Sequence, residues 1–229
     1  MISENGTLNT INNKMLLRST LVVAGPIALQ SLIASSLNLV DNLMIGALGE
    51  LALNAVGVSV QLFFIYWMFV FGFASGAATF MAQFFGANDL VNIRRSTGFT
   101  LCVVFSMGII FFCAAMFFPQ HVLRIFTKYP EVIEAGIPYV RTGAFTFLLT
   151  PITQTLTVVL RATQQTHLPL IASVTGLCTN TFMNYCLIYG HFGFPRLGIQ
   201  GAALATVIAR LVELAIILYF VFGRNNIVK

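Results

Sequence analysis

Long apolar segments separated by short polar breaks run through most of this 229-residue sequence. Each segment can cross a bilayer, for which about 20 residues suffice, and the apolar runs are continuous rather than alternating. This pattern predicts helices instead of the strands of an outer-membrane barrel. The expected helices are residues 16–48, 52–84, 96–118, 132–160, 168–190 and 198–222. We predict that they form one all-α bundle of six transmembrane helices over residues 16–223, between polar tails at residues 1–15 and 224–229.

Lys and Arg are divided unequally between the two predicted sides of the bundle. The side that includes both tails carries Lys14, Arg18, Arg94, Arg95, Arg161, Arg224 and Lys229. The opposite side carries Arg124, Lys128 and Arg196. Because cytoplasmic loops hold an excess of Lys and Arg, this bias predicts that both termini lie in the cytoplasm.

The composition agrees with a membrane-embedded chain. Hydrophobic residues make up 58% of the sequence and charged residues 8%, whereas soluble domains carry about 25% charged residues. So few polar side chains could not cover a globular surface, which predicts an integral protein of the cell membrane with the lipid bilayer as its main partner. The net charge of +5 comes without a basic tract, so nucleic-acid binding is not expected.

The sequence shows no constellation typical of an enzyme. Its three histidines, His121, His167 and His191, fall in predicted loops on both sides of the membrane and cannot jointly bind a metal. The four cysteines lie within apolar runs without metal-ligand spacing. We therefore expect neither enzymatic activity nor an organic cofactor.

Small residues recur at helical spacing in two predicted helices. They are Gly72 and Gly76 in the second helix and Gly201, Ala205 and Ala209 in the sixth. Such spacing lets membrane helices approach closely, although Gly and Ala are common in any membrane helix.

One acid, Asp41, lies inside the first apolar segment, and apolar residues 43–45 follow it. A carboxylate at such a depth costs about 2.5–3.5 kcal/mol on insertion scales, so it is expected to face protein or water. The alternative is that Asp41 lies at the membrane interface, near the end of the helix. Gln30 and Asn38 continue the polar stripe of this helix and are candidate supporting residues.

Three predicted helices place polar side chains at one depth in the bilayer. At about 1.5 Å per residue, Asp41, Asn184 and Thr206 lie roughly 10, 9 and 12 Å from the outer ends of their helices. Asn180 lies one turn from Asn184 on the same helix face. These four residues are the candidate cation- or proton-binding site, called the Asp41 site below.

The chemistry of this group leaves three interpretations open. Oxygens of Asp41, Asn180 and Thr206 could bind Na⁺, a hard cation that prefers oxygen ligands. The carboxyl group of Asp41 could instead carry a proton. The asparagines and the threonine could also serve only as hydrogen-bonding contacts between helices. Arg210 and Glu213, at i and i+3, are predicted to form a structural ion pair.

Several stretches together resemble the multidrug and toxic compound extrusion (MATE) family of transporters. They are PIALQSLIASSLNLVDNLMIGALGELALNAVG from Pro26, GAATFMAQFFGAND from Gly76, LRATQQTHLP from Leu160, NTFMNYCLIYG from Asn180 and FPRLGIQGAALATVIA from Phe194. The resemblance implies antiport of cationic or amphipathic organic compounds against H⁺ or Na⁺. It also implies a fold of two lobes with six helices each. Asp41 matches the family's acid on the first helix, Asn180 its fifth-helix asparagine and Thr206 its sixth-helix threonine.

Two departures from the family pattern change the expectation. The family usually has a second acid where this chain has Asn184, which leaves Asp41 as the sole carboxylate of the site. Since ligand charge largely sets the affinity for hard cations, H⁺ coupling is expected rather than Na⁺ coupling. The chain is also long enough for one lobe only. A second copy, a separate chain or a missing second half would have to supply the other.

Two other functions remain as alternatives at this stage. One is a half-transporter similar to the lipid-linked oligosaccharide flippases, which would need a cationic inner cavity. The other is a membrane module, or a truncated fragment, that does not transport.

Overall fold

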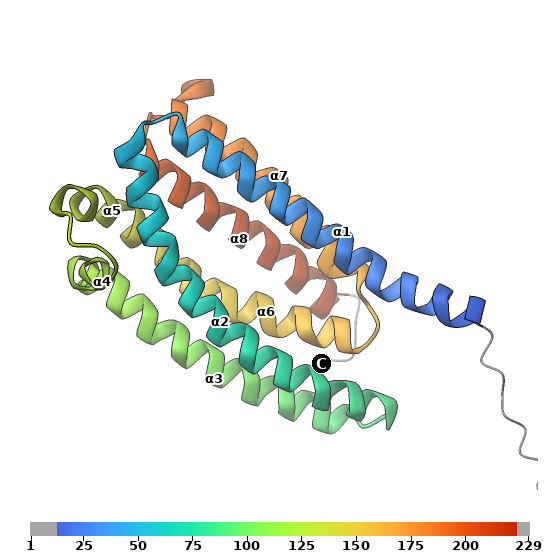
Figure 1. Ribbon diagram of the computed structural model, residues 1–229. Coiled ribbons are helices and arrows are strands. Elements are labelled where there is room, and N and C mark those ends of the chain that lie inside the picture. Colours follow the sequence, from blue (N-terminus) through green and yellow to red (C-terminus); the bar gives the residue numbers. More distant parts are fainter. Residues whose placement is uncertain (1–12, 224–229) are drawn as a thin grey trace, which may run out of the picture.

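The computed structural model describes residues 13–223, and every regular element in that range is helical (Figure 1). The elements are α1 (Asn13–Gly46), α2 (Glu50–Gly86), α3 (Leu90–Phe117), α4 (Pro119–Phe126), α5 (Pro130–Gly143), α6 (Thr146–Ala162), α7 (His167–Tyr189), the 3-10 turn η1 (His191–Gly193) and α8 (Ile199–Gly223). Residues 1–12 and 224–229, which include most of both predicted tails, lie outside the described residues.

The helices form a bundle in which α7 lies between α1 and α8 (Figure 1). On the other side of the bundle, α2 packs against α3, α5 and α6. By length and apolar composition, α2, α3 and α8 can each cross a membrane, and α5 with α6 forms a fourth span that is bent. These spans make the chain an integral membrane protein. Within residues 13–223, three to four helical spans are apolar enough to cross a membrane, where the sequence predicts six.

The fourth predicted helix, residues 132–160, differs most from the structure. It is divided into α5 and α6, which meet at an angle of 47°. Pro151 lies inside α6. Because proline has no N–H, the carbonyl of Phe147, one turn earlier, lacks its helical donor, and the proline ring crowds that carbonyl. The Phe147 N–H turns back to the carbonyl of Ala144 at 2.9 Å, a tighter turn than an α-helix makes. The chain therefore bends where proline disrupts the helical hydrogen bonds.

The carbonyl that Pro151 leaves free is satisfied from a neighbouring helix. The Tyr66 hydroxyl, from α2, donates to the Phe147 oxygen at 3.0 Å, and Tyr66 is 3% exposed. On α3, Gly108 lies against the same carbonyl, since a Cβ there would clash with the Phe147 oxygen. The Phe147 ring stacks on Phe63 at 4.9 Å, so this bend is also the centre of an apolar core.

We predict that Tyr66→Phe destabilises the bundle by about 1–3 kcal/mol, because it leaves a buried carbonyl without a donor while removing one oxygen atom only. Thermal unfolding of the purified chain in detergent measures the effect. Tyr219→Phe, at a tyrosine that is 72% exposed, is the matched control and should leave the midpoint unchanged. An equal midpoint for Tyr66→Phe and the control would contradict the role of this hydrogen bond.

The loop predicted between residues 119 and 130 contains the short helix α4, which is amphipathic. Leu123 is buried in the core, whereas Ile125 is exposed on the opposite side. At the preceding break, Asp89 caps α3 by accepting the Asn92 backbone N–H at 3.1 Å. This hydrogen bond, with a second one from the Asn92 side chain, holds the pKa of Asp89 below its ordinary value.

The two groups of small residues have different surroundings in the structure. A Cβ at Gly201 would come within 2.6 Å of the Leu187 carbonyl oxygen, so α8 approaches α7 as closely as a missing side chain permits. In contrast, a Cβ added to Gly72 or Gly76 of α2 would meet no atom within 4 Å, so both glycines face open space. Among these three glycines, only Gly201 serves helix packing within the described chain, and it fixes α7 against α8 next to the Asp41 site.

Candidate functional site

Asp41 of α1 is half-buried and faces α7. Asn184 Nδ2 donates to Asp41 Oδ1 at 2.6 Å. Asn184 is 1% exposed, so this carboxylate meets its amide partner away from solvent. The short contact joins α1 to α7 across 143 residues of sequence.

Asn180 and Thr206 complete the group, and the Asn180 amide can contact Asp41 in two orientations. In one orientation, Asn180 Nδ2 donates to Thr206 Oγ1 and its oxygen accepts from Asn184 Nδ2, both at 3.3 Å. The amide oxygen then lies against the two carboxylate oxygens of Asp41. With O and N interchanged, the nitrogen donates to these carboxylate oxygens at 3.1 and 2.9 Å, and the oxygen accepts from the Thr206 N–H at 3.3 Å.

The two orientations suit different charge states of Asp41. An ionised carboxylate offers only acceptors, so it requires the orientation in which the Asn180 nitrogen donates. A protonated carboxyl can instead donate its O–H to the Asn180 oxygen. An amide side chain therefore offers a hydrogen-bond partner to either charge state of Asp41.

One polar atom of this group has no hydrogen-bond partner. Asn184 Oδ1 is buried and accepts no hydrogen bond within the described part of the chain. Such atoms are uncommon, because a buried carbonyl oxygen loses its bond to water. Within residues 13–223 no three His, Cys, Asp or Glu side chains are grouped to hold a metal ion. A Na⁺ ion here would thus be bound by one carboxylate and otherwise by neutral oxygens. Asn184 points its N–H, and not its oxygen, towards Asp41.

The two predicted supporting residues do not join this group. Asn38 is exposed on α1. Gln30, three turns from Asp41 on the same helix, belongs to a second polar cluster. Its Nε2 donates to Ser173 Oγ at 2.5 Å, and its Oε1 accepts from Arg161 Nη2 at 2.8 Å.

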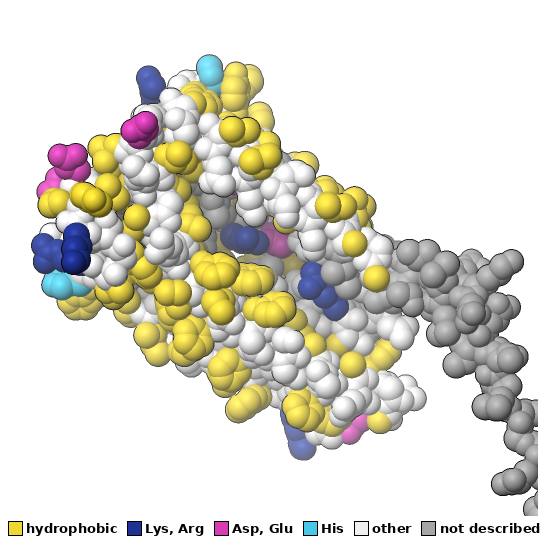
Figure 2. Space-filling model, in the orientation of Figure 1, with side chains coloured by type: hydrophobic (Ala, Val, Ile, Leu, Met, Phe, Trp, Pro, Cys, Tyr) yellow, Lys and Arg dark blue, Asp and Glu magenta, His cyan; other side chains and the backbone are white. Residues whose placement is uncertain are grey.

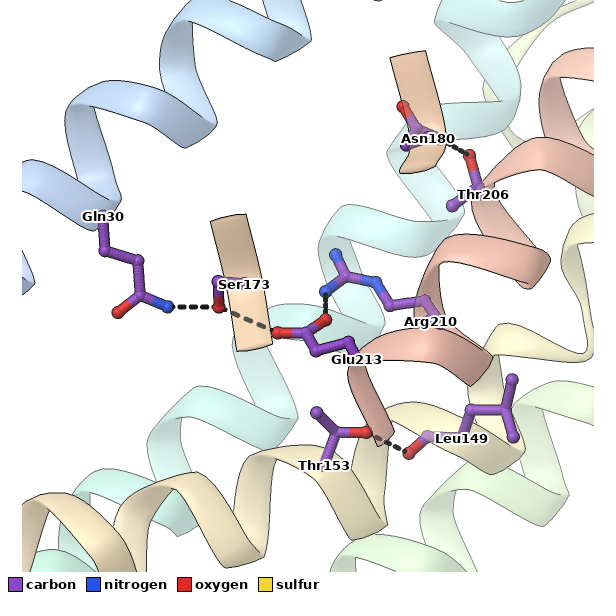
Figure 3. Close-up of polar contacts among 8 residues, drawn as sticks. All are labelled: Gln30, Leu149, Thr153, Ser173, Asn180, Thr206, Arg210 and Glu213. Atoms are coloured by element: carbon purple, nitrogen blue, oxygen red, sulfur yellow. Dashed lines mark hydrogen bonds and ion pairs between the residues drawn. The ribbon is translucent and has the colours of Figure 1, made fainter. Parts of the chain in front are cut away.

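The second polar cluster also contains the predicted ion pair (Figure 3). Ser173 Oγ donates to Glu213 Oε1 at 2.9 Å, and Arg210 Nη1 lies 2.7 Å from Glu213 Oε2. The contacts link α6, α1, α7 and α8 through Arg161, Gln30, Ser173, Glu213 and Arg210. The sequence-based prediction missed Ser173 and Arg161. Ser173 lies seven residues before Asn180, so the two share one face of the helix, and this spacing is the sequence signal that could have identified Ser173.

Comparisons with known proteins find similarity over most of the chain. The MatE family model matches residues 26–186. A probable multidrug resistance protein NorM of Rhizobium meliloti is 29% identical over 204 residues, which cover 89% of this chain and 44% of that protein. The probable multidrug resistance protein YoeA of Bacillus subtilis is 28% identical over 210 residues, which cover 91% of this chain and 45% of that protein. The chain thus spans less than half the length of these curated relatives.

Solved structures share the fold. One is described as the outward-facing conformation of a multidrug resistance MATE family transporter of the MOP superfamily, and it superposes with a TM-score of 0.81 at 21% identity. The match covers 90% of this chain and 45% of that one. The inward-facing conformation described in the same words gives a TM-score of 0.73 at 22% identity, over 83% of this chain and 42% of that one.

Proposed function

The chain belongs to the MATE family, and on this premise we propose that it is one lobe of a transporter that exports organic cations or amphipathic drugs across the cell membrane. We propose H⁺ rather than Na⁺ as the coupling ion, carried by Asp41. Members of the family are transporters, which favours transport over enzymatic activity. The names of the relatives refer to multidrug resistance, so they support export of foreign compounds and do not favour the flippase alternative.

A second lobe is part of this proposal. The chain covers 44–45% of the two relatives described above, so the cleft between two halves, which alternating access by rocking repeats requires, needs another six-helix unit. A second copy of this chain, a separate chain or a further segment of the same polypeptide could supply it.

The Asn180 amide carries the argument for H⁺. An amide carries both a donor and an acceptor, so Asn180 offers Asp41 an N–H at 2.9 Å when the carboxyl is ionised and an oxygen when it is protonated. The surrounding chain can therefore accept a change in the charge of Asp41 without rebuilding the site. Na⁺ would instead need several inward-facing oxygens, and Asn184 presents its N–H to Asp41 at 2.6 Å.

Ion gradients test the proposal directly. We predict that export from cells that express the chain from its native locus stops when an ionophore collapses the pH gradient. Replacing external Na⁺ by choline should change the export rate by less than about twofold, since a site of one carboxylate and donor-presenting amides holds Na⁺ weakly. Ethidium efflux, followed by fluorescence, provides the measurement. Export that fails in choline but survives the ionophore would overturn H⁺ coupling.

A further inference from the structure

Arg210 and Glu213 differ sharply in their access to the surface. The Glu213 side chain is 9% exposed, whereas that of Arg210 is 44% exposed. Both carboxylate oxygens of Glu213 are already engaged, Oε1 by the Ser173 hydroxyl and Oε2 by Arg210. A ligand that reaches this pair therefore meets the guanidinium of Arg210 and not the acid.

The pair belongs to α8 and contacts α7 through Ser173. Figure 2 shows basic and acidic side chains together at the bottom of a hollow over α8, with hydrophobic side chains along its border. Arg210 and Glu213 are the only charged residues between Ile199 and Gly223, the limits of α8. An exposed guanidinium inside a membrane requires water or a polar ligand beside it.

The free edge of the guanidinium suits an acidic group. Arg210 contacts Glu213 through Nη1 alone, and an arginine side chain has five N–H donors in one plane. Two of them can bind one carboxylate in parallel, which a lysine ammonium cannot do with the same geometry. The contacts of Glu213 with Ser173, of Ser173 with Gln30, and of Gln30 with Arg161 hold the other edge in place.

We propose that Arg210 binds the carboxylate of an amphipathic compound whose apolar part lies against the hydrophobic border of the hollow. This inference rests on the proposed transport function and deepens it, because it adds acid-bearing amphiphiles to the substrates expected from an anionic coupling site. Asp41 and Arg210 then have separate tasks. Asp41 carries the coupling proton, and Arg210 selects part of the cargo.

A matched pair of probes isolates the contribution of the carboxylate to binding. Dansylglycine and its methyl ester share the apolar ring system, and only dansylglycine carries the negative charge. The full chain in phosphatidylcholine nanodiscs contains a single tryptophan, Trp67, so energy transfer from Trp67 to the dansyl group reports binding. We expect dansylglycine to bind at least about tenfold more tightly than the ester, as a charge-assisted bidentate contact provides.

Substitutions at the two residues of the ion pair should have opposite effects on the binding of dansylglycine. Arg210→Gln should abolish the preference for dansylglycine over its ester. Glu213→Gln should strengthen dansylglycine binding, because it removes the competing carboxylate and frees another edge of the guanidinium. The double variant Arg210→Gln with Glu213→Gln avoids the unpaired buried acid of the single Arg210 variant, so it should fold and still show no preference.

The controls separate this inference from the coupling function. Arg196→Gln changes an exposed loop arginine and should keep the preference. Binding is measured without an ion gradient, so a failure of the coupling proposal leaves this result intact. Equal binding of acid and ester by the unmodified chain, or a preference that survives Arg210→Gln, would overturn the inference.

Discussion

Asp41→Asn is expected to reduce export by the assembled transporter to the background rate while leaving the amount of folded protein unchanged. The substitution keeps the size of the side chain and one acceptor oxygen, so the contact that Asn184 makes with Asp41 at 2.6 Å can persist. What it removes is the only group in the Asp41 site that can take up and release a proton. Coupling is lost because nothing else there changes charge.

The measurement is ethidium efflux from cells that carry the variant at the native locus, together with immunoblots of the membrane fraction. Asp89→Asn is the matched control. It makes the same chemical change at an acid in the turn before α3, where asparagine caps a helix as well as aspartate does. Its efflux should equal that of the unmodified chain. Efflux at the unmodified rate with Asp41→Asn would remove Asp41 from the mechanism.

Helix limits are the part of the fold that hydropathy predicts best. The second segment is expected at residues 52–84 and α2 spans Glu50–Gly86, and the fifth is expected at 168–190 where α7 spans His167–Tyr189. The division of the fourth segment into α5 and α6 is not predicted. The cause is partly local, in Pro151, and partly distant, because Tyr66 of another helix supplies the missing donor. Hydropathy along one segment contains no information about such a partner.

The Asp41 site is predictable because depth and helix face together locate a side chain. Asp41, Asn180, Asn184 and Thr206 are expected at one level, and the structure links them from helix to helix by polar contacts of 3.3 Å or less. Their roles in coupling stay predictions.

Gln30 shows why helix face alone is insufficient. It shares a face of α1 with Asp41 but lies eleven residues earlier, or about 16 Å along the axis, and so cannot reach the same ligands. Its partners are Ser173 and Arg161. Arg161 lies near the end of a segment, so the sequence analysis counts it among the cytoplasmic charges. In the structure, the packing of α6 against its neighbours turns its guanidinium towards Gln30 instead.

Asn184→Asp should convert the site from one that ignores Na⁺ to one that needs it. Two carboxylates would then lie within 2.6 Å of each other, the present distance between Asn184 Nδ2 and Asp41 Oδ1. Like charges this close cannot both be ionised unless a cation lies between them, so the variant must share a proton or bind a metal ion. At neutral pH and high Na⁺ concentration, the added negative charge favours the metal ion.

Thermal unfolding of the purified chain measures this change without a second lobe. At a Na⁺ concentration about 100 times its Kd, binding to the folded state adds about 2.7 kcal/mol of stability. The Asn184→Asp variant should therefore unfold several degrees higher in NaCl than in choline chloride, while the unmodified chain unfolds at the same temperature in both. Asn38→Asp adds the same charge at an exposed position of α1 and should show no Na⁺ effect. Stabilisation of the unmodified chain by Na⁺ would mean that one carboxylate suffices for the metal ion, and the preference for H⁺ would then be wrong.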